Sequence, residues 1–371
     1  MTSDAISNSA LEARIRTRLD SLTKPPGSLG RLEDLVVQLG VIQQTESPQI
    51  ARKAMIVFCA DHGVVEEGIS PYPSEVTRQM VANYRSGGAA INVLCRHGEI
   101  EPVIVDMGVG NPTRNFAREA AMTRAQAEQA VDTGFAYAAK ADILGAGEMG
   151  IGNTTSAAAL FSAFSGHDPS ETAGRGTGLD DAGVAKKAAV IRRALALHKT
   201  TDPIDTLAAF GGFEIAALTG LILGAASRRH LVMLDGFITG AAAIVARAIA
   251  PASLDYVVFS HCSAEKGHRK MLDYLNASPL LNLEMRLGEG TGIRQDSRAG
   301  ARRRRCGRLA AYMTAGTDRV SRSAIAGDNT RQPAGSGTIR WSGRVLRGRA
   351  AGGNMRRQYR FKSFHQYIGR F

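Results

Sequence analysis

One glutamate in the sequence is placed to act as a proton acceptor. Glu289 stands between Gly288 and Gly290, which leave its side chain uncrowded, and it follows an alternating apolar run over residues 281–287. Burial against that run would raise the pKa of the carboxyl group and make it a general base near neutral pH. A glycine-flanked glutamate at a solvated turn is the alternative, and both interpretations stay open on the residues alone.

Two glycine-rich turns offer groups that bind a phosphate. The first contains Gly150, Gly152, Asn153 and Thr154. It precedes a predicted helix, whose first backbone amides attract anions. The second contains Gly174, Gly176 and Gly178. Lys186 and Lys187 follow it, and one lysine directed at two amide-rich turns would outline a phosphomonoester site. At least one of these two lysines is expected to be a solvated surface residue.

The segment Gly145–Gly150 also fits the dinucleotide pattern GxGxxG, which makes an NAD-dependent oxidoreductase an alternative function. Glu148 argues against it, because a carboxylate inside such a loop repels a pyrophosphate. The sequence also lacks a second strand that ends in an acid about twenty residues later. A glycine-rich turn needed only for tight packing is the simpler interpretation.

The sequence also contains residues that could bind a metal ion. His261, Glu265 and His268 have a spacing that can share one helix face, and Asp61 precedes His62. A tightly bound cation usually needs three convergent ligands, and Lys266 lies beside the first set. We therefore expect hydrogen-bonding histidines and neither a metal nor a redox cofactor.

The predicted strands and helices around these groups alternate along the chain. Short apolar runs lie at 54–59, 101–105, 142–144, 231–234 and 256–259, and each is followed by a glycine-rich turn or a helical stretch. This alternation predicts an α/β fold with a Rossmann-like parallel sheet flanked by helices, with ligands at the carboxyl ends of the strands. Two short helices are predicted before residue 50, on either side of the Lys24–Gly27 stop.

The composition and charge of the chain narrow the class of protein to which it can belong. The chain has 371 residues, 44% of them hydrophobic, and a net charge of +12. That charge is concentrated after residue 292, where 19 Lys and Arg face 3 Asp and Glu. Nucleic-acid binding through this basic tail is a second alternative function. The run Arg302–Arg305 lacks interleaved aromatic residues, however, so no nucleic-acid partner is expected.

Cysteines and targeting signals indicate the compartment. The four cysteines are far apart and form no CxxC pair, which argues against a disulfide framework or a structural zinc site. No secretory signal or membrane-spanning segment is recognised, so we expect a cytoplasmic protein.

Eight motifs, taken in order, resemble one enzyme family. They are KPPGSLG at 24–30, ADHG at 60–63, EVT at 75–77, GEMGIGNTT at 147–155, GGFE at 211–214, LDGF at 234–237, SAEKG at 263–267 and RLGEGTG at 286–292. Over residues 10–292 the chain resembles the nicotinate-nucleotide:dimethylbenzimidazole phosphoribosyltransferases. The resemblance implies transfer of the phosphoribosyl group of nicotinate mononucleotide to 5,6-dimethylbenzimidazole, for the lower ligand of cobalamin. It also implies a homodimer with no membrane partner.

The resemblance also implies roles for individual residues. Glu289 matches the general base, Glu148 a second carboxylate near the ribose, and Lys187 the active-site lysine. The two glycine-rich turns would hold the phosphate. Ser263 and Gly292 match the region of the nicotinate carboxylate, and Tyr72 and Met80 the pocket of the aromatic acceptor.

Three regions are predicted on this basis. Residues 1–50 contribute helices to a small helical domain, residues 51–292 form the large catalytic domain, and residues 293–371 form an atypical basic tail. This tail stands where the family has further helices. A shift of reading frame near codon 293 is our hypothesis for it, with a genuine basic extension as the alternative, and the activity of this chain depends on which holds.

Overall fold

The computed structural model describes residues 8–294, which lie in one compact unit. The helices are α1 (Ser9–Asp20), α2 (Arg31–Gln43), α3 (Glu75–Arg85), α4 (Ala90–His97), α5 (Arg124–Tyr137), α6 (Asn153–Ser165), α7 (Pro169–Thr172), α8 (Asp181–Leu197), α9 (Pro203–Phe210), α10 (Phe213–Arg228), α11 (Phe237–Ile249), α12 (His268–Tyr274) and α13 (Thr291–Arg294). Short 3-10 helices are η1 (Gly63–Glu67), η2 (Ala138–Lys140) and η3 (Pro251–Tyr256). The predicted tail lies outside the described residues from position 295 on.

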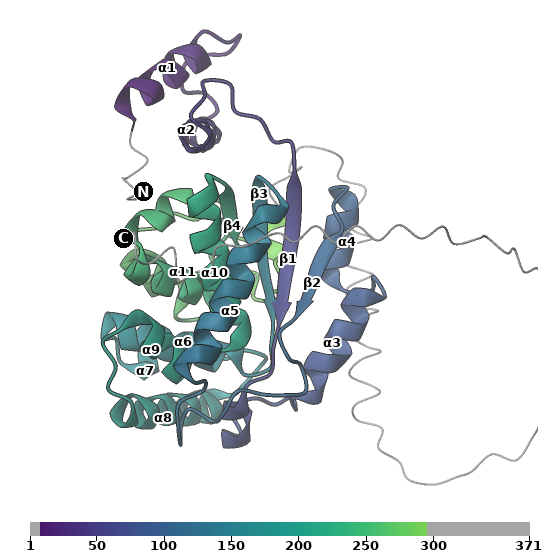
Figure 1. Ribbon diagram of the computed structural model, residues 1–371, viewed down its shortest axis with the longest axis vertical. Helices are drawn as coiled ribbons and strands as arrows, with labels where there is room; N and C mark the ends of the chain where they lie inside the picture. The colour runs from purple at the N-terminus through teal and green to yellow at the C-terminus, as the bar shows by residue number, and fades with distance from the viewer. Residues whose placement is uncertain (1–7, 295–371) are drawn as a thin grey trace, which may run out of the picture. The chain divides into compact units, whose positions relative to one another are not determined.

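The strands form one parallel sheet. They are β1 (Lys53–Cys59), β2 (Pro102–Asp106), β3 (Ile143–Met149), β4 (Leu231–Leu234) and β5 (Val257–Phe259), in the spatial order β2-β1-β3-β4-β5. Every neighbouring pair is parallel. In Figure 1 the arrows of β1 and β2 point downward, toward α8. The predicted α/β fold with a Rossmann-like sheet is confirmed, because all five predicted strands are present.

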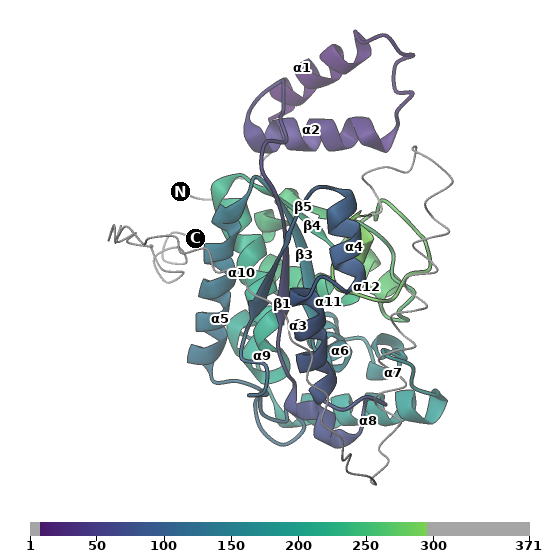
Figure 2. The same cartoon turned by 90° about the vertical axis from the view of Figure 1, so that its right-hand side faces the viewer.

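Helices cover both faces of the sheet. Alternate residues of β1 point to opposite faces, as a strand requires. Ile56 and Phe58 join the core that includes α5 and α10, whereas Met55, Val57 and Cys59 pack with residues of α3 and α4. Figure 2 shows α5 and α10 on one side of the strands and α4 on the other. Burial on both faces explains why the strands read as continuous apolar runs.

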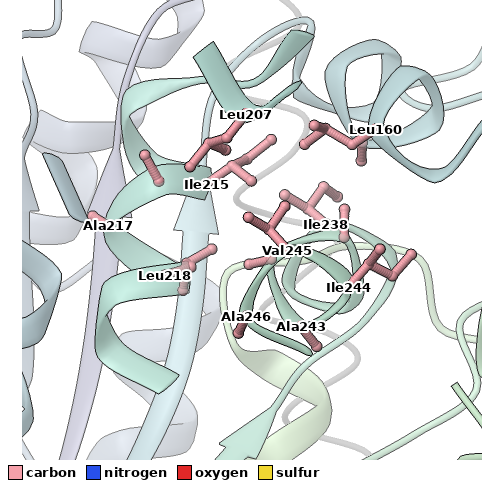
Figure 3. Packing of buried hydrophobic residues seen from close by; sticks show 14 of the residues in the cluster. Leu160, Leu207, Ile215, Ala217, Leu218, Ile238, Ala243, Ile244, Val245 and Ala246 are labelled. Atoms are coloured by element: carbon pink, nitrogen blue, oxygen red, sulfur yellow. The ribbon is translucent and has the colours of Figure 1, made fainter. Parts of the chain in front are cut away.

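The larger core lies among α6, α9, α10 and α11. Figure 3 shows Leu160, Leu207, Ile215, Leu218 and Ile238 converging between these helices. Burying one such side chain contributes about 1.5–3 kcal/mol. This packing stabilises the elements that carry the turns at the carboxyl edge of the sheet.

Strand β3 is longer than the sequence predicted, and this overturns the dinucleotide interpretation. The glycines of Gly145–Gly150 lie mostly inside the strand, where Gly145 pairs with Met55 and Gly147 with Val57. A Cβ on Gly145 would lie 2.7 Å from the Met55 side chain, and one on Gly147 would lie 2.5 Å from the Glu289 backbone oxygen. These glycines therefore allow close packing, and the turn after the strand begins only at Gly150.

The two predicted N-terminal helices are present as α1 and α2. Leu11, Ile15 and Leu19 of α1 pack against Val37 and Val41 of α2. Helix α2 also contacts η3 and β5, since the Gln38 side chain donates to the backbone oxygens of Asp255 and Val257. No helix among residues 8–294 is long and apolar enough to cross a membrane.

Candidate active site

A cavity of about 290 Å³ opens at the carboxyl edge of the sheet. Its walls come from the segments that follow β3, β4 and β5, together with the Arg286–Gly288 segment. Among the predicted site residues, those that line it are Tyr72, Glu148, Gly150, Asn153, Thr154, Gly176 and Ser263. A parallel sheet is expected to bind ligands at this edge.

Glu148 occupies the end of β3 and is buried, with 5% of its surface exposed. Its Oε2 accepts a hydrogen bond from the Asn153 side chain, at the first residue of α6. Burial raises the pKa of Glu148 to about 8, and the nearby charges of Asp235, Glu214 and Glu289 act in the same direction. Glu148 is therefore largely protonated at pH 7, and it can donate a hydrogen bond as well as accept one.

Glu289 is buried too, with 5% of its surface exposed. Burial raises the pKa of its carboxyl group to about 7, and the Ile91 backbone amide and the Tyr84 hydroxyl oppose that shift. Its Oε2 has no hydrogen-bond partner among the described residues. A carboxyl group that titrates near neutral pH and keeps one oxygen free suits a general base.

Asp235, which follows β4, fixes the loop that carries Glu289. Its two carboxylate oxygens accept the backbone N–H groups of Gly290 at 2.8 Å and Gly292 at 2.7 Å. Burial raises the pKa of Asp235 to about 7, and these backbone hydrogen bonds oppose the shift. Asp235 belongs to the Leu234–Phe237 motif, but no role for it was predicted from the sequence. Its position directly after a predicted strand was the available signal.

The structure distinguishes the two candidate lysines. Lys186 is exposed, whereas Lys187 has 1% of its surface exposed. The Lys187 ammonium donates to Thr154 Oγ1 at 3.1 Å and to the Gly174 backbone oxygen at 3.2 Å. Burial lowers its pKa to about 8, and Glu265 opposes that shift. Lys187 thus joins the two glycine-rich turns.

The amides of the second turn already have acceptors inside the protein. Gly176 N–H is shared by the two carboxylate oxygens of Glu265, each at 3.2 Å, and Gly178 N–H donates to the Arg175 backbone oxygen. A phosphate at this turn would compete with Glu265 for the Gly176 amide. The first turn uses two amides in the same way, since Ile151 N–H donates to Thr77 Oγ1 and Asn153 N–H donates to the Gly150 backbone oxygen.

The three residues considered as metal ligands do not share a helix face. Only His268 lies in a helix, at the first position of α12, and its Nδ1 accepts the Ser263 backbone N–H at 2.8 Å. Burial lowers the pKa of both His261 and His268, that of His268 to about 3. Within residues 8–294 no group of His, Cys, Asp and Glu is arranged to hold a metal ion.

Some predicted substrate residues lie away from the cavity surface. Met80 packs on the apolar face of the sheet beside Val57 and Tyr84, and Gly292 lies behind the cavity, with its amide bound to Asp235. Tyr72 is 43% exposed and lines the cavity. The predicted acceptor pocket near Tyr72 and Met80 is thus only partly represented in this cavity.

Comparisons with known proteins identify the family of the chain. The sequence model of a family described as phosphoribosyltransferase matches residues 6–294. A protein from Ralstonia nicotianae and one from Chloroflexus aggregans are both named nicotinate-nucleotide–dimethylbenzimidazole phosphoribosyltransferase. The first is 50% identical over 76% of this chain and 86% of its own length. The second is 49% identical over 75% of this chain and 85% of its own length.

A solved structure has a similar fold. The crystal structure of CobT from Thermus thermophilus matches with a TM-score of 0.74 at 38% identity, covering 83% of this chain and 95% of that one. The chain is an enzyme of the phosphoribosyltransferase family that includes the nicotinate-nucleotide–dimethylbenzimidazole phosphoribosyltransferases.

Proposed function

We propose that the chain transfers the phosphoribosyl group of nicotinate mononucleotide to 5,6-dimethylbenzimidazole, giving α-ribazole 5′-phosphate and nicotinate for the lower ligand of cobalamin. The observation that carries the proposal is that buried carboxyl groups lie at and beside one cavity. The chain is also 49–50% identical in sequence to enzymes of that name. A reaction that needs one proton removed at neutral pH fits carboxyl groups that titrate near pH 7.

The proposed chemistry is a displacement at C1′ of the ribose. The unprotonated ring nitrogen of the benzimidazole attacks C1′ from the face opposite the pyridinium, so a new C1′–N bond forms while the bond to nicotinate breaks. The electron pair leaves with nicotinate, whose pyridinium ring is already a good leaving group. Glu289 takes the proton from the other benzimidazole nitrogen. Inversion at C1′ turns the β-nucleotide into an α-nucleotide.

The remaining residues hold the substrates. Lys187 stabilises the two glycine-rich turns and supplies positive charge for the 5′-phosphate, because it bridges Thr154 and Gly174. Glu148 contacts the ribose as a hydrogen-bond donor. The substrates are thereby aligned before reaction, and such alignment lowers the barrier by itself.

A direct assay tests this proposal. The full chain is incubated with nicotinate mononucleotide and 5,6-dimethylbenzimidazole, and nicotinate and the new nucleotide are separated by chromatography. We expect nicotinate release that depends on the added benzimidazole, with an equal amount of α-nucleotide. Nicotinate release that is independent of benzimidazole, or no release at all, would contradict the proposal.

We also propose that the enzyme acts in the cytoplasm as a homodimer and binds neither nucleic acid nor membrane. Three exposed leucines in the turn between α1 and α2 and at the start of α2 support a further protein contact there: Leu22 (50% exposed), Leu29 (52%) and Leu32 (61%). Light scattering of the full chain after size exclusion tests the dimer. A single species at the mass of one chain would contradict it.

A further inference from the structure

A chain of three buried side chains lies beneath the first glycine-rich turn. His62 Nε2 lies 2.6 Å from Glu214 Oε1, and His62 Nδ1 lies 3.0 Å from Ser156 Oγ. None of the three is more than 1% exposed. The 2.6 Å distance fits a short, charge-assisted hydrogen bond from Nε2 to a carboxylate. Ser156 cannot reach a substrate from this position, so the arrangement does not serve as a nucleophile with its base.

The first turn rests directly on this pair. A Cβ added to Gly150 would lie 2.5 Å from the Ala60 backbone oxygen, 3.2 Å from His62 Nε2 and 3.3 Å from Glu214 Oε1. One added to Gly212 would overlap the His62 ring and lie 2.5 Å from Glu214 Oε2. These glycines let two backbone segments pack against the buried His62–Glu214 hydrogen bond with no side chain between them. A change in the pair must therefore be transmitted to the turn.

The pair is also linked to Glu148. Gly150 lies two residues after Glu148, and Asn153, at the end of the same turn, donates to the Glu148 carboxyl group. Burial is the main cause of the raised pKa of Glu148, and the charges of Asp235 and Glu214 add to the shift. Glu214 Oε2 has no hydrogen-bond partner among the described residues. The charge on this side of Glu148 thus comes from a carboxylate that is held in place by His62.

We propose that the buried His62–Glu214 pair is a positioning unit for the reaction, which holds the Gly150–Asn153 turn in place and sets the electrostatic environment of Glu148. This inference rests on the proposed function, because it assigns the pair a part in that reaction. His62 and Glu214 touch no substrate and act only through the turn and through Glu148.

Substitution of the histidine tests the mechanical part. In His62→Gln the turn loses its support, and we expect kcat/KM for nicotinate mononucleotide to fall at least about tenfold, because small displacements at a reacting centre are costly. His230→Gln is the matched control. His230 Nδ1 lies 2.9 Å from the Ala138 backbone oxygen, and the ring lies near Asp142, at the opposite end of the sheet. Equal activity of the two variants would overturn the proposal.

Substitution of the glutamate tests the electrostatic part and keeps the shape of the side chain. In Glu214→Gln one negative charge beside Glu148 is lost, so the Glu148 carboxyl should titrate at a pH lower by about half a unit or more. The carboxyl carbon of Glu148 is followed by ¹³C NMR against pH, with its signal assigned by its loss in Glu148→Gln. An unchanged midpoint would refute the coupling, even where His62→Gln fails to fold.

The dependence of kcat/KM on pH separates an electrostatic role of Glu214 from a merely structural one, because a loss of packing alone would not shift this profile to another pH. We expect the part of the kcat/KM profile that reports Glu148 to shift to lower pH in Glu214→Gln, and no such shift when Glu148→Gln is already present. The same shift in both backgrounds would contradict the proposal. A wild-type chain that releases no nicotinate would refute the proposed function instead, while the NMR titration would still decide whether Glu214 acts on Glu148.

Discussion

The carboxylate of Asp235 accepts the backbone N–H of Gly290 at 2.8 Å, one residue beyond Glu289. Glu289 has a left-handed backbone with φ of 66°, a conformation that costs a non-glycine residue about 1 kcal/mol or more. Asp235 also holds Gly292, so the strained residue lies beside a segment that is anchored twice. The proposed base is therefore placed by a residue from a distant part of the chain.

Asp235→Asn should displace the Glu289 loop, because an amide nitrogen cannot accept a backbone N–H. We expect kcat to fall at least about tenfold, since the proposed base would move from the reacting centre. Asp202→Asn is the control: Asp202 also accepts two backbone N–H groups, from Ile204 and Asp205, but at the start of α9. Steady-state kinetics of both variants give the comparison, and equal loss in both would count against the role of Asp235.

Glu289→Gln keeps the size of the side chain but removes its ability to accept a proton. We expect kcat to fall about 100-fold or more, in line with the usual contribution of a general base. The affinity for nicotinate mononucleotide, measured by calorimetry, should change little. Glu284→Gln, at an exposed residue of the same segment, should retain full turnover. Full turnover by Glu289→Gln would refute the assignment.

The pH dependence of activity should report Glu289. The pKa of its carboxyl group is about 7, and a base must be ionised to act. Below pH 7 we therefore expect kcat/KM to fall, approaching about tenfold per pH unit, and above pH 7 this dependence should level off. A rate profile measured from about pH 5.5 to 8 checks this. A flat profile across that range would exclude an essential group titrating there.

Stability should depend on pH through Glu148. Its pKa is raised from 4.5 to about 8 in the folded protein, so between these values the folded state binds more protons than the unfolded state. By linkage, this group makes the free energy of unfolding decrease as pH rises through that window, by an amount on the order of 1 kcal/mol per pH unit. The variant Glu148→Gln lacks the titration.

Urea unfolding of Glu148→Gln and wild type at about pH 5, 6.5 and 8 isolates this contribution. We expect the variant to gain stability relative to wild type as pH rises, because the other titrating groups affect both proteins similarly. A constant difference across the three values would show that burial does not raise the pKa of Glu148.

Two neighbouring lysines provide a matched pair. Lys187→Met removes the ammonium that bridges Thr154 and Gly174, and we expect KM for nicotinate mononucleotide to rise at least about tenfold. Lys186→Met removes the same charge from an exposed position one residue earlier and should leave KM unchanged within about twofold. Equal KM values for the two variants would refute the role of Lys187. Thermal melting should stay similar, because methionine can fill a buried site without a charge.

Local patterns in the sequence were enough to predict the type and order of the main elements. The run Leu231–Leu234 is a strand with the bounds that its apolar pattern predicted, and the two helices before residue 50 have the predicted spacing. These signals are local, because side-chain periodicity and glycine-rich turns act over a few neighbouring residues. The eight motifs, read together, also indicated the family, which the comparisons confirm.

Which of these residues act together depends on the tertiary structure. The sequence placed a turn at Gly145–Gly150, whereas packing against Met55 keeps the chain in a strand as far as Met149. The partnership of Asp235 with the Glu289 loop and that of His62 with Glu214 join residues that are far apart in the chain. Burial and electric charge act through space, so the pKa of a carboxyl group depends on neighbours that the local pattern does not contain.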